Sequence, residues 1–373
     1  MPRRIALLFE YPTLNGGERS LLQTLELLDS REFEIIALAP TAGRLADALR
    51  AKSIQHVPFD LRDHADVRLP RDQVLAKLVE LIRRQAPDLL HANSLSMGRI
   101  TGTLAAQLAI PCVAHVRDII GLSRAAISDL NQNHTLIAVS HATREFHIAQ
   151  GLSAARTRVI FNGVEADRFR PRRKTDALCR ELKIPETSFV VLTIGQIGLR
   201  KGQDVLAAAA PAIAESVSQV HFVIVGERHS SKDESIAYES KLESDFARAG
   251  LGDRLHLLGY RDDVEHLMSE AHLLVHPAKQ EPLGRVLLEA AASGLPIVAT
   301  DVGGTSEIVT DGVSARLVAP NDCEQLADAV IELAGDHTLR GNFAAIARNN
   351  VNRIFTPQAA ADNLTDVWHQ ALE

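Results

Sequence analysis

The sequence predicts an α/β protein with two Rossmann-like domains, each built on a doubly wound parallel sheet. The chain has 373 residues, which is more than one hydrophobic core usually supports. Short apolar runs rich in Val, Ile and Leu alternate with longer segments of helical periodicity. The same alternation occurs in both halves of the chain. Alternating strands and helices are typical of parallel sheets covered by helices, so two domains of one class are expected.

In the first half, six apolar runs are short enough to be buried strands. They are Ile5–Phe9, Phe33–Ala39, Asp88–Leu90, Cys112–Val116, Leu136–Val139 and Val159–Phe161. Helical patterns lie between them at Glu18–Leu28, Gln73–Gln85 and Ser94–Leu108. We therefore assign residues 1–165 to the first domain. The segment from Asn162 to Ser188 is rich in charged and turn residues, so we interpret it as the connection.

The second half repeats the scheme, and residues 186–350 form the second predicted domain. Its expected strands are Phe189–Ile194, His221–Val225, Leu255–Leu257, Leu273–His276, Ile297–Thr300 and Ala315–Val318. The chain from Asp322 onward is helical in pattern and is interrupted around Phe355-Thr-Pro357. We assign residues 351–373 to a separate C-terminal helical segment.

Composition limits the class of protein. Hydrophobic residues make up 46% of the chain and charged residues 23%, as in ordinary soluble proteins. No apolar run approaches the length of a membrane span, and Met1 to Glu10 looks like a first strand rather than a signal peptide. The three cysteines have neither disulfide nor metal spacing, which favours a reducing cytoplasm.

Net charge is −7 and is unevenly distributed. Residues 1–163 carry 19 basic and 16 acidic side chains, whereas residues 164–373 carry 21 and 31. The basic first half is compatible with peripheral contact with an anionic membrane, for example at its inner face. Chance combined with solubility explains the asymmetry equally simply. No basic patch interleaved with aromatic residues suggests binding to nucleic acid.

The most informative stretch runs from His276 to Glu307. It begins at the end of an expected strand and continues through a polar turn to a helix that starts near Gly284. A stop signal at Ser293-Gly294-Leu295-Pro296 precedes the next strand, and Gly303-Gly304 opens another short helix. Two helix N-termini therefore lie at the same sheet edge, where α/β proteins bind ligands and where free N–H groups suit phosphate.

Two acids in this stretch, Glu281 and Glu289, are eight positions apart and cannot share one helical face. They converge only if the loop folds back over the helix start. An ionised carboxylate accepts hydrogen bonds from two neighbouring hydroxyls, as a sugar or ribose diol offers. The alternative for each is a solvated Glu on a helix surface. Apolar neighbours around Glu289 leave little solvated surface and weaken that alternative.

Three other loops follow expected strands. Asn15-Gly16-Gly17 opens a helix and favours either an anion or a plain turn. Lys201, in a glycine-rich loop after a strand, suits a diphosphate, although a surface-loop Lys is the alternative. His91 and His115 end two strands at the binding edge, where a structural role is the simpler explanation for either residue alone.

The stretch from His276 to Glu307 contains Glu281-Pro-Leu-Gly, a second Glu that follows Glu281 after seven intervening residues, Ser-Gly-Leu-Pro-Ile-Val-Ala-Thr, and Gly-Gly-x-x-Glu. Together these four features resemble the retaining glycosyltransferases of the GT-B fold, family four. The resemblance implies two facing Rossmann-like domains with a cleft between them. It also implies that a last helix, here Gln358–Leu372, crosses back to the first domain. The donor would be a nucleoside diphosphate sugar, such as a UDP-sugar or a GDP-sugar, with no further cofactor.

The resemblance also assigns roles in the second domain. Glu289 would hold the ribose diol and Glu281 the hydroxyls of the donor sugar. Lys201 and Arg200 would stabilise the departing diphosphate, together with backbone N–H groups of the helix start at Leu283, Gly284 and Arg285. The family usually has Arg where this chain has Gln196, which puts a paired Arg/Lys clamp in doubt.

Three further assignments come from the same resemblance. Gly16 and Gly17 would lie between donor and acceptor, and His115 would lie near the transferred sugar. Gly259-Tyr-Arg261 matches the loop whose backbone contacts the base near Arg261, although Arg261 would serve equally as a surface charge.

The resulting expectation is a retaining hexosyltransferase acting on a glycan, lipid-linked or small-molecule acceptor, as in polysaccharide or glycolipid biosynthesis. The chain has no Asp-x-Asp motif, so we expect no divalent metal to be required. Two alternatives remain, namely a nucleotide-sugar epimerase of the same architecture and a non-catalytic protein that binds sugar nucleotides.

Overall fold

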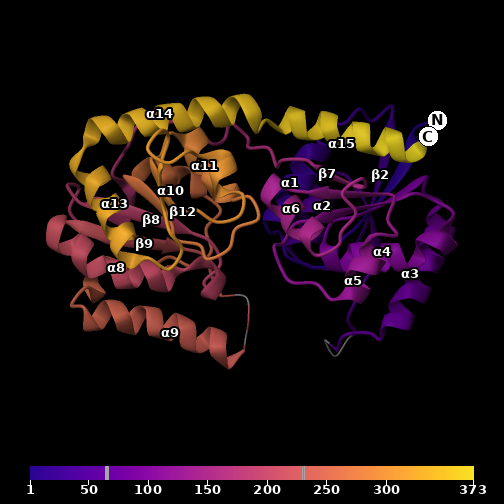
Figure 1. Cartoon of the computed structure of the whole chain (residues 1–373), viewed down its shortest axis with the longest axis horizontal. Helices are drawn as coiled ribbons and strands as arrows, with labels where there is room; N and C mark the ends of the chain where they lie inside the picture. Colours follow the sequence, from indigo (N-terminus) through magenta and orange to yellow (C-terminus); the bar gives the residue numbers. More distant parts are fainter. Residues whose placement is uncertain (64–66, 229, 231) are drawn as a thin grey trace. The chain divides into compact units, whose positions relative to one another are not determined.

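The computed structural model describes residues 1–63, 67–228, 230 and 232–373 (Figure 1). The chain forms two compact units. Unit 1 comprises Met1–Gly163 together with Pro357–Glu373, and unit 2 comprises Val164–Thr356. Each unit contains a parallel sheet covered by helices, so the predicted class of two Rossmann-like domains is confirmed.

In its described part, unit 1 has a seven-stranded parallel sheet in the order β3-β2-β1-β4-β5-β6-β7. The strands are β1 Arg3–Leu8, β2 Phe33–Ala39, β3 Gln55–Pro58, β4 Leu89–Ala92, β5 Cys112–Val116, β6 Thr135–Ala138 and β7 Thr157–Val159. Six of them coincide with predicted strands to within about two residues. The sequence prediction missed β3, because this edge strand is only half-buried and has no apolar run.

The helices of unit 1 include one from the end of the chain. They are α1 Gly16–Leu25, α2 Arg44–Ala51, α3 Arg71–Gln85, α4 Leu95–Leu108, α5 Arg124–Leu130, α6 His141–Ala149 and α15 Pro357–Leu372. The apolar face of α15 is buried in the unit 1 core, where fully buried Trp368 packs edge-on against Phe33 of β2. This packing attaches the C-terminal helix to the first sheet.

Unit 2 has a six-stranded parallel sheet in the order β10-β9-β8-β11-β12-β13 within the residues described. Its strands are β8 Phe189–Ile194, β9 Val220–Val225, β10 Leu255–Leu257, β11 Leu273–His276, β12 Ile297–Thr300 and β13 Arg316–Val318. Each agrees with a predicted strand, because apolar residues predominate in every one. The core lies between this sheet and the helices on its two faces.

The helices of unit 2 begin before its sheet. They are α7 Ala177–Leu182, α8 Gln203–Ser216, α9 Asp233–Arg248, α10 Val264–Glu270, α11 Arg285–Ser293, α12 Thr305–Ile308, α13 Cys323–Gly335 and α14 His337–Ile354, with short 3₁₀ turns η1 Leu199–Lys201 and η2 Gly252–Arg254. The segment that we interpreted as a connection contains α7 and packs in unit 2. Thr175, for example, donates its N–H to the Glu270 carboxylate at 2.8 Å.

The two strand orders reverse direction at one point in each sheet, between β1 and β4 in unit 1 and between β8 and β11 in unit 2. Loops that leave adjacent strands in opposite directions open a crevice at the carboxyl ends, and ligands of α/β sheets bind there. The loops after these four strands are therefore the places to look for a site. Within the described residues, no helix combines the length and apolar character needed to cross a membrane.

Candidate active site

Three loops of unit 2 are joined at the carboxyl edge of its sheet. The loop after β8 accepts a hydrogen bond at the Arg200 carbonyl from the Lys279 N–H of the loop after β11, at 2.9 Å. The Glu281 carbonyl in turn accepts one from the Gly304 N–H of the loop after β12, at 3.0 Å. These backbone bonds hold the three predicted binding loops in one rigid cluster at the reversal point.

A buried ion pair spans the reversal point itself. Lys201 Nζ donates to Glu281 Oε2 at 2.5 Å, and His276 Nε2 lies 2.9 Å from the same oxygen. Lys201 follows β8, whereas His276 ends β11, so their shared contact with Glu281 links the two central strands. The structure thus brings together two residues that the sequence assigned to one site. It also adds His276, whose position at the end of a strand was the available signal.

The charge state of this cluster follows from its partners. Burial alone would raise the pKa of Glu281, but the Lys201 ammonium and the His276 hydrogen bond outweigh it and hold that pKa well below its usual range. Burial lowers the pKa of His276, so the imidazole is neutral and donates its Nε2 proton to the ionised carboxylate. The cluster therefore carries one cation and one anion at neutral pH.

Two glycines make this loop arrangement possible. Gly202 has a φ of +67°, and a Cβ there would lie 1.8 Å from the Pro277 carbonyl oxygen. Gly284 has a φ of +104°, and a Cβ would lie 2.7 Å from Leu287 Cδ1. At Gly202 the clash is with backbone, so a side chain does not fit unless a loop moves, whereas at Gly284 the positive φ and the Leu287 side chain both disfavour one. Gly284 is also the residue that precedes α11.

The start of α11 offers backbone donors. The N–H groups of Leu283, Gly284 and Arg285 have no acceptor within their helix, and the described residues supply none elsewhere. Lys201 and these N–H groups lie on loops that are bonded to each other, so a cation and a helix N-terminus are both available to an anion.

The second predicted acid is held separately from the first. Glu289 accepts a hydrogen bond from Arg285 Nε at 2.8 Å, one helical turn away, and both side chains are largely buried. Glu281 and Glu289 are therefore oriented by different cations and do not contact each other. The carboxylate of Glu289 retains acceptor capacity beyond this one bond.

Gln196, Arg200 and Lys201 line one hollow of unit 2, which is completed by Gly198 and by Glu234, Ser235 and Tyr238 of α9. Gln196 is exposed, and its carbonyl is fixed by the Gln203 amide at 3.0 Å. The predicted donor-binding residues of the loop after β8 therefore share one surface. Gln196 contributes an amide to this surface rather than a second fixed cation.

Arg261 lies in the loop between β10 and α10, and its side chain is engaged by two acids. It contacts Glu181 at 2.5 Å and Asp263 at 2.7 Å. The neighbouring Gly259 has a φ of +63°, and its carbonyl accepts the Gly226 N–H at 2.8 Å. The guanidinium thus anchors the loop, which leaves only the backbone here for the predicted contact with a base.

In unit 1, His115 belongs to a buried line of three aromatic side chains. Trp368 Nε1 of α15 lies 3.1 Å from His91 Nδ1, and His91 Nε2 lies 2.7 Å from His115 Nδ1. Burial and the nearby Arg117 guanidinium lower the pKa of His91 to about 3 and that of His115 well below its usual range. Both imidazoles are therefore neutral, and the sequence analysis did not anticipate the part of Trp368.

The loop after β1 meets the same edge. Gly16 and Gly17 begin α1, and a Cβ on Gly17 would lie 3.0 Å from Arg117 Cδ, so glycine leaves room for that side chain. Arg117 donates to the Asn93 side-chain oxygen at 2.9 Å and to that of Asn162 at 3.2 Å. Arg117 was not predicted as a site residue, although it lies two residues after His115 at the end of a strand.

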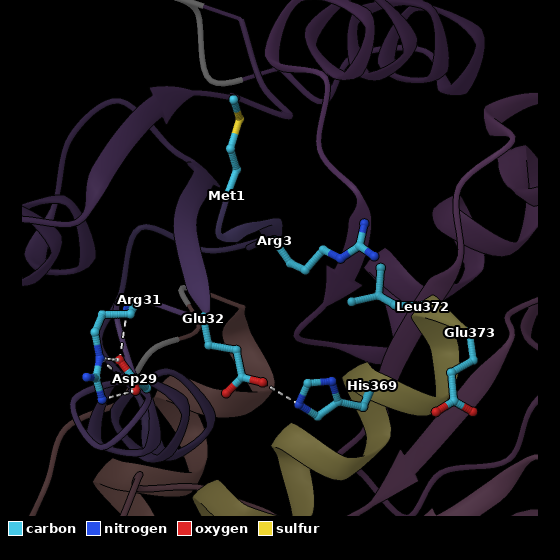
Figure 2. A pocket seen from close by; sticks show the side chains of 8 residues that line it. All are labelled: Met1, Arg3, Asp29, Arg31, Glu32, His369, Leu372 and Glu373. Atoms are coloured by element: carbon cyan, nitrogen blue, oxygen red, sulfur yellow. Dashed lines mark hydrogen bonds and ion pairs between the residues drawn. The ribbon is translucent and has the colours of Figure 1, made fainter.

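Another surface hollow of unit 1 lies away from these loops. Figure 2 shows Glu32 and His369 pointing toward each other and Asp29 paired with Arg31, and Met1 and Arg3 complete one wall. Arg3 begins β1 and Glu32 precedes β2, so this hollow is at the amino ends of the strands, opposite the predicted site. The described residues contain no group of three or more His, Cys, Asp or Glu side chains arranged to hold a metal ion.

Comparisons with known proteins agree with this arrangement. The family model described as Glycosyl transferases group 1 matches residues 175–350, and that described as Glycosyltransferase Family 4 matches residues 14–168. A UDP-Gal:alpha-D-GlcNAc-diphosphoundecaprenol alpha-1,3-galactosyltransferase of Escherichia coli is 27% identical over 96% of this chain and 94% of its own. A GDP-mannose-dependent alpha-mannosyltransferase of Mycobacterium tuberculosis is 28% identical over 93% and 92%.

Solved structures give the same fold. The Anabaena protein HepE in complex with UDP and glucose superposes with a TM-score of 0.86 at 24% identity, covering 98% of this chain and 99% of its own. WaaG, a glycosyltransferase involved in lipopolysaccharide biosynthesis, superposes with a TM-score of 0.74 at 19% identity over 97% and 99%. Two family models that span most of the chain, together with neighbours of matching architecture, lead to one conclusion: the chain belongs to the group 1, family 4-type glycosyltransferases and has the GT-B fold.

Proposed function

We propose that this glycosyltransferase moves a hexose from a UDP-sugar to an acceptor hydroxyl with retention of anomeric configuration. The observation that carries the proposal is the Lys201–Glu281 pair across the reversal point of the second sheet, beside the start of α11. Relatives that use UDP-galactose and GDP-mannose, and a neighbour solved with UDP and glucose, support a nucleotide-sugar donor. A GDP-sugar is the competing donor.

Lys201 has the position and charge to receive the diphosphate. In the absence of donor it is neutralised by Glu281, which keeps the ammonium oriented in a largely buried site. The free N–H groups of Leu283, Gly284 and Arg285 add fixed dipoles at the same place. Arg200, on the same loop, supplies a second cation. These groups stabilise the charge that develops on the leaving diphosphate.

The two acids bind hydroxyls of the donor. Glu281, ionised and held by Lys201 and His276, accepts hydrogen bonds from the hexose hydroxyls. Glu289, oriented by Arg285, accepts them from the ribose diol. Backbone atoms of the loop at Arg261 contact the base. In unit 1, the loop at Gly16 and Gly17 and the side chain of His115 face the transferred sugar and the acceptor.

The bond changes are simple. The bond between the anomeric carbon and the diphosphate oxygen breaks, and the acceptor oxygen forms its bond to the same face of that carbon. The acceptor proton moves to the departing diphosphate oxygen. This route requires no general base from the protein, and the Glu281 carboxylate beside Lys201 is already held by Lys201 and His276.

The acceptor that we propose is a lipid-linked saccharide or another glycan. One relative is named for a diphosphoundecaprenol acceptor, and another is the lipopolysaccharide core mannosyltransferase LpsB of Rhizobium meliloti. The basic excess of residues 1–163 suits an anionic membrane surface, so we place the enzyme in the cytoplasm in peripheral contact with such a surface. Sedimentation with vesicles containing phosphatidylglycerol, but not with neutral vesicles, would support this placement.

Two steps test the proposed reaction. Thermal shift with UDP, GDP and ADP identifies the base, and incubation of UDP-glucose, UDP-galactose or GDP-mannose with a short-chain lipid diphosphate saccharide then follows transfer. NMR of the product should show the anomeric configuration of the donor, and Glu289→Ala should abolish transfer without unfolding the chain. Donor epimerised in the absence of acceptor, or nucleotide binding without turnover of any donor, would overturn the proposal in favour of an epimerase or a binding protein.

A further inference from the structure

The line Trp368–His91–His115 has a direction, because one end of it has a fixed hydrogen-bonding character. An indole nitrogen is a donor only, so Trp368 Nε1 donates to His91 Nδ1 at 3.1 Å. His91 Nδ1 therefore carries no proton, and the ring proton of His91 is on Nε2. In the described chain, His91 Nε2 has one hydrogen-bond partner, His115 Nδ1 at 2.7 Å, so His91 donates to His115.

The position of the ring proton on His115 follows in the same way. His115 Nδ1 accepts a hydrogen bond, so the proton of the neutral His115 ring is on Nε2. This nitrogen makes no hydrogen bond to any part of the chain that the structure describes. The His115 side chain lines a small pocket together with Ser20, Arg117 and Asn162, at the carboxyl edge of the first sheet. A fixed N–H donor is thus left for an oxygen that the protein itself does not supply.

We infer that Trp368 and His91 are positioning residues that fix His115 as the Nε2–H tautomer, so that His115 donates a hydrogen bond to a substrate oxygen and does not act as a general base. The nearby Arg117 cation disfavours a second proton on either ring, which is consistent with this assignment. The inference rests on the proposed function only in naming that oxygen as one of the donor sugar or the acceptor. The tautomer itself depends on the line of three side chains alone.

The packing of Trp368 in the C-terminal helix keeps its indole N–H directed at His91. Trp368 is fully buried and is packed edge-on against Phe33 and against the His91 ring. An indole that is wedged on two sides cannot rotate its N–H away from His91 without opening a cavity. The last helix therefore contributes to the chemistry of unit 1 through hydrogen-bond direction, in addition to covering its sheet.

The first test is spectroscopic and requires no substrate. Protein labelled with ¹⁵N-histidine is examined by long-range ¹H–¹⁵N correlation, with His115→Gln used to assign the signals of residue 115. We expect the Nε2–H pattern for both His91 and His115 in the wild type. In Trp368→Phe, which keeps an aromatic ring but loses the indole donor, we expect His115 to populate the other tautomer. A wild-type His115 protonated on Nδ1, or an unchanged tautomer in Trp368→Phe, would overturn the inference.

The second test measures transfer. Loss of the Trp368 donor should lower kcat roughly 5- to 10-fold, the size expected for one net hydrogen bond, with little change in nucleotide affinity. His91→Leu should behave in the same way, whereas His91→Gln should stay close to the wild type, because an amide can accept from Trp368 and donate to His115. Phe33→Leu is the control for lost packing, because it changes the side chain beside Trp368 without removing any donor, and it should lower kcat less than Trp368→Phe does. Equal activity in His91→Leu and His91→Gln would contradict the inference.

The outcomes separate this inference from the proposed reaction. If wild-type protein transfers no sugar from any donor but shows the Nε2–H tautomer and its dependence on Trp368, the proposed function fails and the positioning chain stands. If transfer is observed while the tautomer is independent of Trp368, the reverse holds. If His91→Leu does not fold, the wild-type and Trp368→Phe spectra still decide the question.

Discussion

The two sheets have the same class of fold, but their carboxyl edges are equipped differently. The edge of unit 2 carries paired charges: Lys201 with Glu281 on loops that contain positive-φ glycines, and Arg285 with Glu289 at the start of α11. At the edge of unit 1, neutral imidazoles and amides lie around the Arg117 guanidinium. Paired charges can be redistributed toward a diphosphate, whereas neutral donors suit hydroxyl groups. The same architecture can therefore carry two different sets of functional groups through its side chains alone.

Replacing Lys201 by Met should have a large effect on transfer, because it removes the cation of the Lys201–Glu281 pair from the edge of unit 2. We expect kcat to fall by on the order of 10²- to 10³-fold, as when a group aligned with developing charge is removed. Lys279→Met is the matched control, since its ammonium lies on an adjoining loop but pairs with Asp204 at 2.7 Å. Steady-state kinetics of both variants decides the matter, and comparable losses would show that charge in general, rather than Lys201, is what the edge needs.

Gly202→Ala tests whether the edge of unit 2 depends on its backbone as much as on its charges. A Cβ at φ +67° would overlap the Pro277 carbonyl, so we expect unfolding to become easier by about 1–3 kcal/mol and the Lys201 loop to shift. Gly198 lies in the same loop with an extended φ of 166°, and a Cβ there meets nothing within 4 Å. Gly198→Ala should therefore be close to neutral in urea denaturation. Similar losses for both glycines would refute the argument.

The same contrast determines how much of the molecule could be predicted from sequence. Apolar residues predominate in the strands of unit 2, and the motif from His276 to Glu307 is local, so the fold and the candidate residues could be predicted from residues that are close together in the sequence. The half-buried edge strand Gln55–Pro58 has no such run and was missed. The membership of Lys201 and Glu281 in one site could be expected, but their direct pairing across 80 positions could not.

The site in unit 1 was harder to predict for a physical reason. His91 and His115 are 24 positions apart, and Trp368 is 277 positions from His91. No local pattern connects residues on two strands and a terminal helix, because only the packed fold brings their ring nitrogens together. The direction of their hydrogen bonds is likewise invisible in a sequence, since it depends on which nitrogen faces which donor.

Unfolding measured as a function of pH tests whether the His91 imidazole of unit 1 is neutral in the folded protein. Folding lowers the pKa of His91 to about 3, whereas an unfolded His has a pKa of about 6.5. The unfolded state therefore binds a proton between these values that the folded state does not, so this contribution to stability is complete above about pH 6.5 and is lost as pH falls. His91→Gln removes the contribution and should flatten the pH dependence of unfolding by up to about 1.4 kcal/mol per pH unit between pH 6 and 4.

The measurement can be made on unit 1 selectively. Trp368 is the single tryptophan of the chain and is buried in unit 1, so its fluorescence in urea follows that unit. His272→Gln in unit 2 is the control, because burial also lowers the pKa of His272, to about 4, yet its loss should not alter the slope seen by Trp368. An identical slope in the wild type and His91→Gln would mean that His91 is not neutral in the folded protein.

The smallest effect is expected at Arg261, where the question is whether the edge of unit 2 uses a further side-chain cation. Its guanidinium is taken up by Glu181 and Asp263 near the surface, and such pairs contribute on the order of 0.2–1 kcal/mol. Arg261→Ala should therefore lower stability within that range and leave the Kd for UDP within about twofold, because a twofold change corresponds to only about 0.4 kcal/mol.

Gly259→Ala, which strains the backbone at φ +63°, should weaken UDP binding more if backbone atoms contact the base. Calorimetry with UDP compares the two variants directly. A large loss of affinity in Arg261→Ala with unchanged stability would make the guanidinium itself a ligand, and the charged edge of unit 2 would then extend beyond the reversal point to the loop after β10.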